Sequence, residues 1–134
     1  MFKISPIQDK ETQISYAALC GTSFVDGSFG YAMIDQLTGE LMAFSQFEIL
    51  GEVGHIYDIR PRIGYEDYEA LFILGRQTMN FIDICGAHIC RANPNAGEER
   101  LLRAIGFKMK DDGFYFCDMT GMFDGHCDGS TVQL

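Results

Sequence analysis

The sequence predicts a single domain of the α/β (α+β) class, with a mixed, mostly antiparallel sheet and helices on both faces. Three observations favour this class. The chain has 134 residues, of which 47% are hydrophobic and 22% charged, as in a globular domain. Segments with strand-like alternation are interspersed with segments of helical periodicity. The later segments contain a strand–helix–strand unit, which needs a parallel neighbour in the sheet.

The first half of the chain is predicted to be strands around one helix. Residues 2–7 have strand character, and Asp9 is a suitable N-cap for a helix that runs to Cys20. A loop rich in glycine and serine follows at 21–30. The next strands are expected at 31–35, 41–49 and 55–60, separated by turns at 36–40 and 51–54.

The second half begins with the strongest helix signal of the sequence. From Tyr65 to Ile84, apolar residues recur at three- and four-residue spacing and line one face. The elements expected after it are a strand at 88–92, a helix at 97–105, and a closing hairpin of 108–110 and 114–117. We expect one domain over residues 1–120 and an irregular tail over 121–134.

The charge and hydropathy of the chain bear on its partners. A net charge of −9 works against binding to nucleic acid or to anionic lipid. No apolar run is long enough to cross a membrane, and the first residues lack the apolar core of a signal peptide. We therefore expect a cytoplasmic protein that binds neither nucleic acid nor a membrane.

The five cysteines do not predict a disulfide framework or a metal site. Their number is odd and their spacing irregular, which favours reduced thiols that are buried as small hydrophobic side chains. The run from Cys85 to Cys90 includes His88, but it lacks the two paired clusters that are typical of a zinc site. We expect no bound metal.

The order of elements, together with the Gly106-Phe107 pair after the last helix, resembles the GCN5-related N-acetyltransferase (GNAT) superfamily. Members of this acyl-CoA N-acyltransferase fold have such a pair before the final strand, and an asparagine after the fifth strand, where this chain has Asn95. Residues 55–85 resemble the strand, turn and long helix of the family's coenzyme A unit. The segment before the second strand is short, so one of the usual early helices is expected to be absent. The resemblance implies transfer of an acetyl group from acetyl-CoA to an amine.

The sequence departs from the family in two of the features that this chemistry uses. The loop before the long helix usually reads Gln/Arg-x-x-Gly-x-Gly/Ala, whereas residues 60–67 keep only Gly64. Glu66 and Asp67 stand at the expected start of the helix, where carboxylates would cap the free N–H groups and repel a pyrophosphate. The tyrosine that protonates the departing thiolate is replaced by Leu102. The acetyl-CoA motif is therefore degenerate.

The resemblance nevertheless implies a set of residues near the coenzyme. Arg60, Arg62, Gly64 and Tyr65 lie on the loop that would approach it, and arginine side chains suit phosphate oxygens. Asn95 is in the position of the asparagine that touches the coenzyme arm; its alternative role is that of a turn residue after a proline.

Two carboxylates are candidates for the base that deprotonates the amine. Glu48 lies near the end of a long strand, and Asp58 lies in the next strand. The alternative for each is a solvated position on a strand face. The acidic chain favours a cationic acceptor, either a small molecule or a peptide amine, such as a polyamine or lysine.

The sequence leaves two functions open. The first is an acetyl-CoA-dependent N-acetyltransferase with an unknown acceptor amine. The second is a non-catalytic binding or regulatory module that has lost coenzyme A binding and acts, for example, as a homodimer. The missing glycines, the carboxylates at the helix start and Leu102 motivate the second function.

Overall fold

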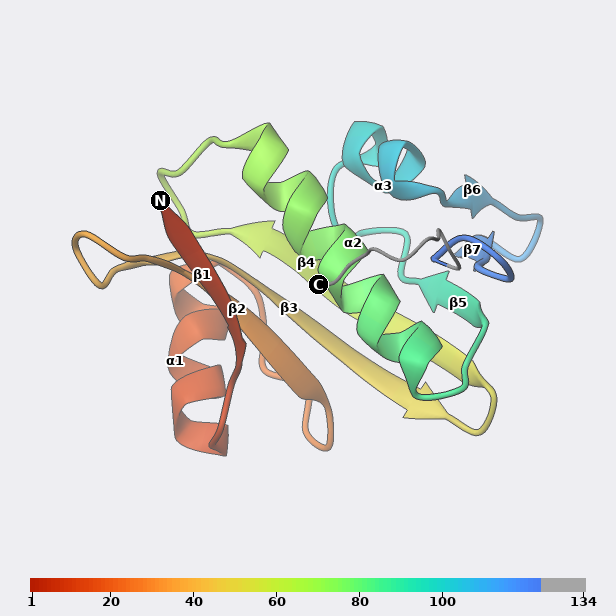
Figure 1. The fold of residues 1–134 in the computed structure, drawn as a ribbon, viewed down its shortest axis with the longest axis horizontal. Helices are drawn as coiled ribbons and strands as arrows, with labels where there is room; N and C mark the ends of the chain where they lie inside the picture. The colour runs from red at the N-terminus through yellow and green to blue at the C-terminus, as the bar shows by residue number, and fades with distance from the viewer. Residues whose placement is uncertain (124–134) are drawn as a thin grey trace.

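The computed structural model describes residues 1–123, which form one seven-stranded sheet with helices on both faces (Figure 1). Its elements are β1 (Phe2–Pro6), α1 (Lys10–Leu19), β2 (Phe29–Asp35), β3 (Leu41–Leu50), β4 (Val53–Pro61), α2 (Tyr68–Ile84), β5 (Ile89–Ala92), α3 (Glu99–Ile105), β6 (Lys108–Met109) and β7 (Tyr115–Asp118). The strand order in the sheet is β1-β2-β3-β4-β5-β7-β6. The predicted fold class is confirmed. The tail predicted from residue 121 lies outside the described residues from position 124 onward.

All strand pairs are antiparallel except β4 and β5, which are parallel. The parallel pairing is short, and its last partners are Ile56 and Ala92. β4 extends beyond this last parallel pair, to Pro61. The helix that makes the crossover between these two strands is α2, as the strand–helix–strand pattern predicts.

The pairing of β3 with β4 contains a β-bulge. Gln46 is opposite Asp58, whereas the next residue, Phe47, is opposite Ile56, so that Tyr57 is the extra residue on β4. Consecutive side chains of a regular strand point to opposite faces, and a bulge changes this alternation locally. Here Tyr57 and Asp58 hydrogen-bond to Glu48 and Gln46, which are two residues apart on β3 and share a face. The bulge therefore places both side chains on the same face.

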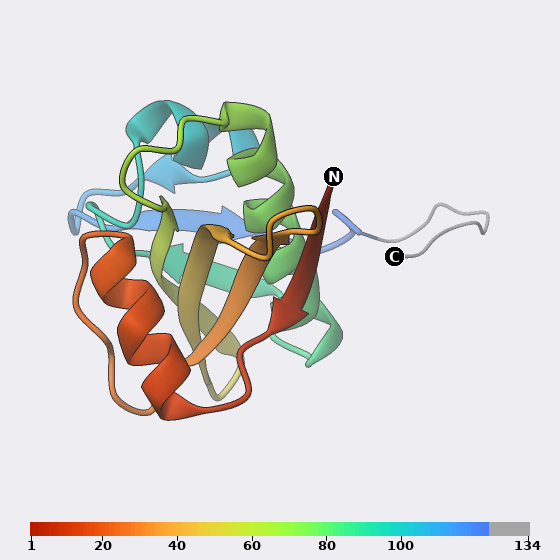
Figure 2. The same cartoon turned by 90° about the vertical axis from the view of Figure 1, so that its left-hand side faces the viewer.

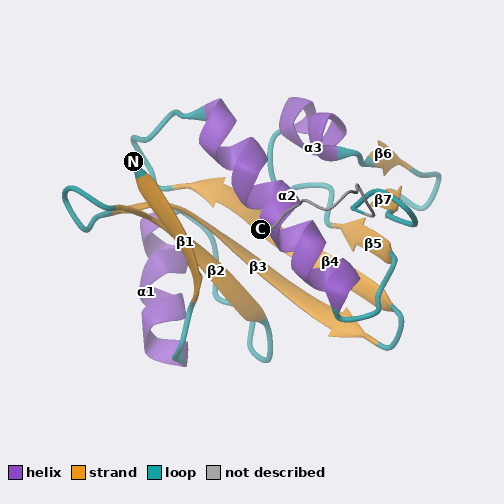
Figure 3. Ribbon diagram, viewed as in Figure 1, coloured by secondary structure: helices purple, strands orange, loops and turns teal. Residues whose placement is uncertain are grey.

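The helices cover the two faces of the sheet unequally. α1 lies on one face, and α2 and α3 lie on the other (Figures 2 and 3). The larger core cluster is on the α2 side, where Leu74, Met79 and Ile82 are fully buried on the predicted apolar stripe of the helix. The smaller cluster, on the α1 side, includes Phe44 of β3. The face beneath α2 is thus closed by the apolar side chains that the periodicity of the long helix predicts.

Four predicted boundaries were wrong by two or three residues, and the first is the start of β2, which is Phe29 instead of 31. α2 begins at Tyr68 instead of 65, because Asp67 has extended backbone angles and its carboxylate accepts a hydrogen bond from Ala70 N at 3.0 Å. α3 begins at Glu99 instead of 97, after an N-cap at Glu98. β4 begins at Val53, since residues 53 and 54 pair with β3 rather than extending the turn.

Most of the described cysteines are buried, as expected for reduced thiols in a globular domain. Cys20, Cys90 and Cys117 are buried free thiols, and Cys85 is an exposed one. Burial raises the pKa of the Cys20 thiol to about 12, with a further contribution from the Asp58 carboxylate. None of the helices within residues 1–123 has the length and apolar character needed to cross a membrane.

Candidate functional site

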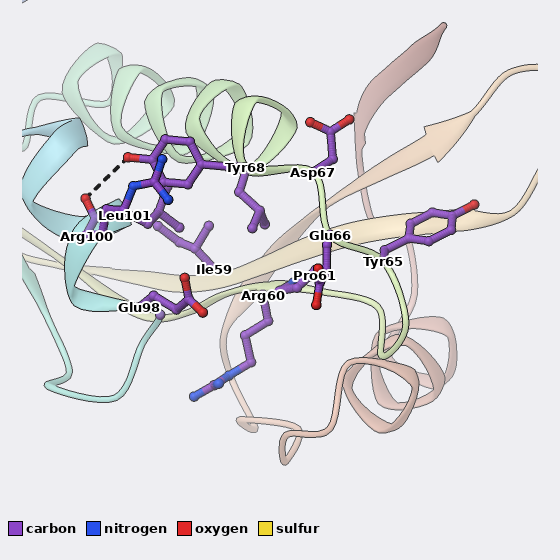
Figure 4. A pocket seen from close by; sticks show the side chains of 12 residues that line it. Ile59, Arg60, Pro61, Tyr65, Glu66, Asp67, Tyr68, Glu98, Arg100 and Leu101 are labelled. Carbon is purple, nitrogen blue, oxygen red and sulfur yellow. Dashed lines mark hydrogen bonds between the residues drawn. The ribbon is translucent and has the colours of Figure 1, made fainter.

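A cleft of about 520 Å³ opens where β4 continues beyond the end of β5 (Figure 4). It lies between the end of β4, the start of α2 and the start of α3. The residues that line it are Ile59, Arg60, Pro61, Tyr65, Glu66, Asp67, Tyr68, Leu71, Gly97, Glu98, Arg100 and Leu101. Its position at a splayed pair of parallel strands, beside two helix N-termini, is typical of a ligand site in an α/β sheet.

Tyr68 and Arg100 form one wall of the cleft. The Arg100 guanidinium lies over the Tyr68 ring, 4.0 Å from the ring centroid. Figure 4 shows the two side chains side by side, with the Tyr68 hydroxyl donating to the Arg100 carbonyl oxygen at 3.4 Å. Arg100 is exposed, so the stacking holds a planar cation at the cleft with its donors accessible.

The helix N-termini that face the cleft carry several carboxylate side chains. Asp67 caps α2, Glu66 precedes it and Glu98 stands at the N-cap of α3. The N-terminus of a helix stabilises negative charge, and here that charge is supplied by the chain itself. A second anion at the same place would meet both the occupied Ala70 N–H and the charge of Asp67. The first turn of α2 therefore does not fit the pyrophosphate cradle that the family resemblance implies.

Arg60 lines the cleft, but its guanidinium points away from the start of α2 (Figure 4). Its Nε donates to Asp58 Oδ1 at 2.7 Å, and Nη2 donates to the carbonyl oxygen of Asn95. Asp58 is 4% exposed. The pair ties β4 to the segment after β5, so neither charge is free in this arrangement.

The other residues expected near the coenzyme are only partly brought together. Tyr65 lines the cleft, whereas Arg62 stacks on the Tyr65 ring at 5.1 Å and forms an ion pair with Glu40. Gly64 is exposed in the β4–α2 loop with φ +98°, so the backbone alone explains the glycine. Asn95 is exposed and contributes its carbonyl oxygen to Arg60.

The two candidate bases differ in their surroundings. Asp58 is buried and accepts hydrogen bonds from Gln46, Thr22 and Arg60. Glu48 is half-buried and accepts a hydrogen bond from the Tyr57 hydroxyl at 2.6 Å. This bond, with burial and the charge of Glu48, raises the pKa of Tyr57 to about 12. Glu48 is therefore the more accessible of the two carboxylates.

Three residues were missed from the sequence: Tyr68 and Arg100, which form a wall of the cleft, and Gln46, which lies behind it. Arg100 lies in the helix predicted at 97–105 and was given no role, although a cation in the first turn of a helix opposes the dipole and is a signal of another role. Gln46 was read as an ordinary strand residue, although its amide is fully buried at the centre of a polar network. Leu102, which replaces the family's tyrosine, is fully buried in the core.

The described residues contain no group of three or more His, Cys, Asp or Glu side chains that could hold a metal ion. The Cys85–Cys90 run does not form such a group in residues 1–123, because Cys90 is buried and Cys85 is exposed.

No family model matches this sequence, and no curated protein is similar enough in sequence to match it. Solved structures do match the fold. The ribosomal-protein-S18-alanine N-acetyltransferase from Escherichia coli is 12% identical, with a TM-score of 0.68 over 100% of both chains. An acetyltransferase from Bacillus subtilis in complex with CoA is 12% identical, with a TM-score of 0.66 over 82% of this chain and 78% of the other. An IAA acetyltransferase from Bacillus cereus is 12% identical, with a TM-score of 0.60 over 83% and 79%.

The fold thus has the acyl-CoA N-acyltransferase architecture. More narrowly, the fold is that of the GCN5-related N-acetyltransferases, and the resemblance seen in the sequence is confirmed at this level. Sequence identity of 12% to these structures shows the fold alone, so the chemistry has to be argued from the residues of the cleft.

The hydrogen bond between Tyr57 and Glu48 predicts a specific pH dependence of stability. The folded pKa of Tyr57, about 12, is above the ordinary value of 10.0, so the unfolded chain loses this proton first as pH rises. The bond stabilises the fold fully below pH ~10 and is lost between pH ~10 and ~12. In urea titrations at pH 9 to 12, the free energy of unfolding should fall more steeply for the wild type than for Tyr57→Phe. Equal slopes would contradict the pairing.

The close approach of Gly97 to β4 predicts that this wall of the cleft cannot carry a larger residue. A Cβ at position 97 would lie 3.0 Å from the backbone oxygen of Ile59, which is tighter than ordinary contact. We expect Gly97→Ala to lower the free energy of unfolding by ~1–3 kcal/mol, measured by denaturant titration. Asn95→Ala, an exposed side chain of the same segment, is the control and should change stability little. A neutral Gly97→Ala would mean that the wall is loosely held.

Proposed function

We propose that this protein is an acetyltransferase-like enzyme that binds acetyl-CoA in the cleft between the starts of α2 and α3 and acetylates a cationic amine. The observation that carries the proposal is the cleft itself. It lies at the end of β4 and the start of the long helix, where the family resemblance expects the coenzyme. Solved structures with this fold include an acetyltransferase in complex with CoA.

The cleft has the size of a small-molecule site and offers part of the chemistry that a coenzyme needs. A volume of about 520 Å³ is in the range of small-molecule sites, and the wall offers aromatic surface from Tyr68 and a cation from Arg100. The carboxylates of Glu66 and Asp67 weaken the site for phosphate groups. We therefore expect binding through Arg100, Tyr68 and Tyr65 rather than through the first turn of α2, and a modest affinity.

When bound, acetyl-CoA would supply an activated acetyl group, and the chain would have to remove a proton from the amine. Glu48 does not itself line the cleft, but it is the side chain we propose for this step, because it is half-buried and accepts its hydrogen bond from a neutral hydroxyl. Asp58 is less suited, because Arg60 and Gln46 already donate to its two oxygens. No proton donor for the departing thiolate is assigned, since Leu102 is buried in the core.

The charge of the protein supports a cationic acceptor. The net charge is −9, and the cleft is lined by Glu66, Asp67 and Glu98 as well as by Arg60 and Arg100. Complementary charge raises the rate of encounter with a polyamine or a lysine side chain and disfavours anionic acceptors.

The binding part of the proposal is tested by calorimetry with Asp67→Asn. Asparagine caps a helix as well as aspartate, so the variant removes one negative charge from the cleft and keeps the cap to Ala70. Acetyl-CoA should bind the variant roughly three- to tenfold more tightly than the wild type, since ~1.4 kcal/mol corresponds to a factor of ten. Asp9→Asn is the matched control, because Asp9 caps α1 in the same way on the other side of the sheet. Absence of binding to both wild type and Asp67→Asn at millimolar acetyl-CoA would overturn the proposal.

The catalytic part is tested by following release of the free CoA thiol with polyamine and lysine-peptide acceptors. Glu48→Gln should lower the rate of transfer ~10²-fold or more and leave acetyl-CoA binding unchanged, as expected for loss of a general base. An unchanged rate would remove Glu48 from this role.

A second function is favoured by the carboxylates at both helix starts and by the buried Leu102. In this alternative, the chain keeps the fold as a binding or regulatory module without coenzyme A, for example as a homodimer. The calorimetry above distinguishes the two, because a module of this kind binds acetyl-CoA neither as wild type nor as Asp67→Asn. Sedimentation of the wild type would then report its association state.

A further inference from the structure

A buried chain of polar side chains runs from the 21–30 loop to the wall of the cleft. Its central members are Gln46, Asp58 and Arg60, and we call it the Gln46–Asp58–Arg60 chain. Gln46 is fully buried and Asp58 is 4% exposed, whereas Arg60 is 27% exposed at the cleft. Burial of polar groups is unfavourable unless each is hydrogen-bonded, so the partners of these three side chains show what they hold in place.

Gln46 holds the loop. Its Oε1 accepts from Val25 N at 3.1 Å and from Gln13 Nε2 at 2.9 Å. Its Nε2 donates to the Ser23 carbonyl oxygen at 3.0 Å and to Asp58 Oδ2 at 2.8 Å. A backbone N–H can only donate and a backbone carbonyl can only accept, so Val25 and Ser23 fix which end of the amide is oxygen. Gln46 must therefore present a donor to Asp58.

Asp58 joins the loop to Arg60. Oδ2 accepts from Gln46, and Oδ1 accepts from Thr22 Oγ1 at 3.0 Å and from Arg60 Nε at 2.7 Å. Gln46 Nε2 and Arg60 Nε can only donate, so both oxygens of Asp58 act as hydrogen-bond acceptors. Removal of any one partner leaves a buried donor or acceptor unsatisfied, which costs more than the bond itself contributes.

Arg60 connects the Gln46–Asp58–Arg60 chain to the wall of the cleft. It donates to the Asn95 carbonyl oxygen, in the 93–97 segment that follows β5. The same segment is held to β4 by a hydrogen bond from Ile59 N to the Ala96 oxygen at 2.8 Å. Gly97, at the end of this segment, lines the cleft together with Ile59 and Arg60. The wall and the loop are thus connected through the hydrogen bonds of Gln46, Asp58 and Arg60.

We infer that the Gln46–Asp58–Arg60 chain positions the 21–30 loop and the 93–97 wall as one unit, with Asp58 as the positioning residue. Neither end can move away without leaving a buried charge or amide unpaired, so disorder at one end is transmitted to the other. The inference goes beyond the proposed function and does not depend on which ligand the cleft takes.

The inference is tested by amide hydrogen exchange at two backbone N–H groups, followed by NMR. Val25 N–H reports on the loop, and Ile59 N–H reports on the wall. Arg60→Met keeps the aliphatic stem and removes the donors at the cleft end, yet it should accelerate exchange of Val25 at least fivefold. Gln46→Leu acts at the loop end, yet it should accelerate exchange of Ile59 to a similar degree. Arg60→Lys, which keeps a charged donor, should restore part of the protection.

The control is Thr78→Val, which removes the buried hydrogen bond between Thr78 and Ser45 on the other face of β3. It lowers stability without touching the chain, so it shows how far a general loss of stability accelerates exchange of both amides. The inference is overturned when each substitution accelerates only the nearer amide, or when both amides respond no more than in Thr78→Val. Arg60 is at the surface, so the Arg60→Met arm decides the matter even when Gln46→Leu does not fold.

Discussion

β4 extends beyond the end of its parallel neighbour β5, and the cleft lies in the region where β4 no longer pairs with β5. Pairing with β5 ends at Ile56 and Ala92, whereas β4 continues to Pro61. Beyond the junction, a buried N–H of β4 still requires an acceptor, because an unpaired backbone group is unfavourable in the interior. The 93–97 segment supplies one, with Ala96 accepting from Ile59. The backbone then continues into α3, and the cleft lies between this segment and α2.

The β-bulge at Tyr57 determines which polar side chains face the α1 side of the sheet. In a regular strand, Tyr57 and Asp58 would point to opposite faces, and one of them would enter the apolar core beneath α2. The extra residue instead directs one to Glu48 and the other to Gln46. The carboxyl group of Asp58 is tolerated at 4% exposure because Gln46, Thr22 and Arg60 all donate to it. The bulge and the buried network are therefore one structural feature.

The sequence was sufficient for the elements that local chemistry specifies. Asp9 as an N-cap and the apolar stripe of the long helix predicted α1 and α2, and the Gly106-Phe107 pair led to the fold. The bulge could not be predicted, because no residue type marks the position at which β4 gains a residue. Without the bulge, Asp58 reads as a solvated strand residue and Gln46 as an ordinary one, although both are buried. These polar side chains have a structural role only because the fold buries them. The identity of a polar residue in the sequence does not show whether the fold will bury it.

The stability of this fold and the presence of a coenzyme site are separable properties. The core is formed by α2 against β3 and β4, where Leu74 and Ile82 are fully buried, and none of its members belongs to the loop at 62–67. The loop contributes one cap, Asp67, and helix capping by aspartate stabilises a helix by ~1 kcal/mol. A carboxylate at that position thus stabilises α2 and opposes a bound phosphate at the same time. The fold is therefore retained whichever effect is larger, and a carboxylate at the start of α2 lowers the affinity for a coenzyme that binds nearby.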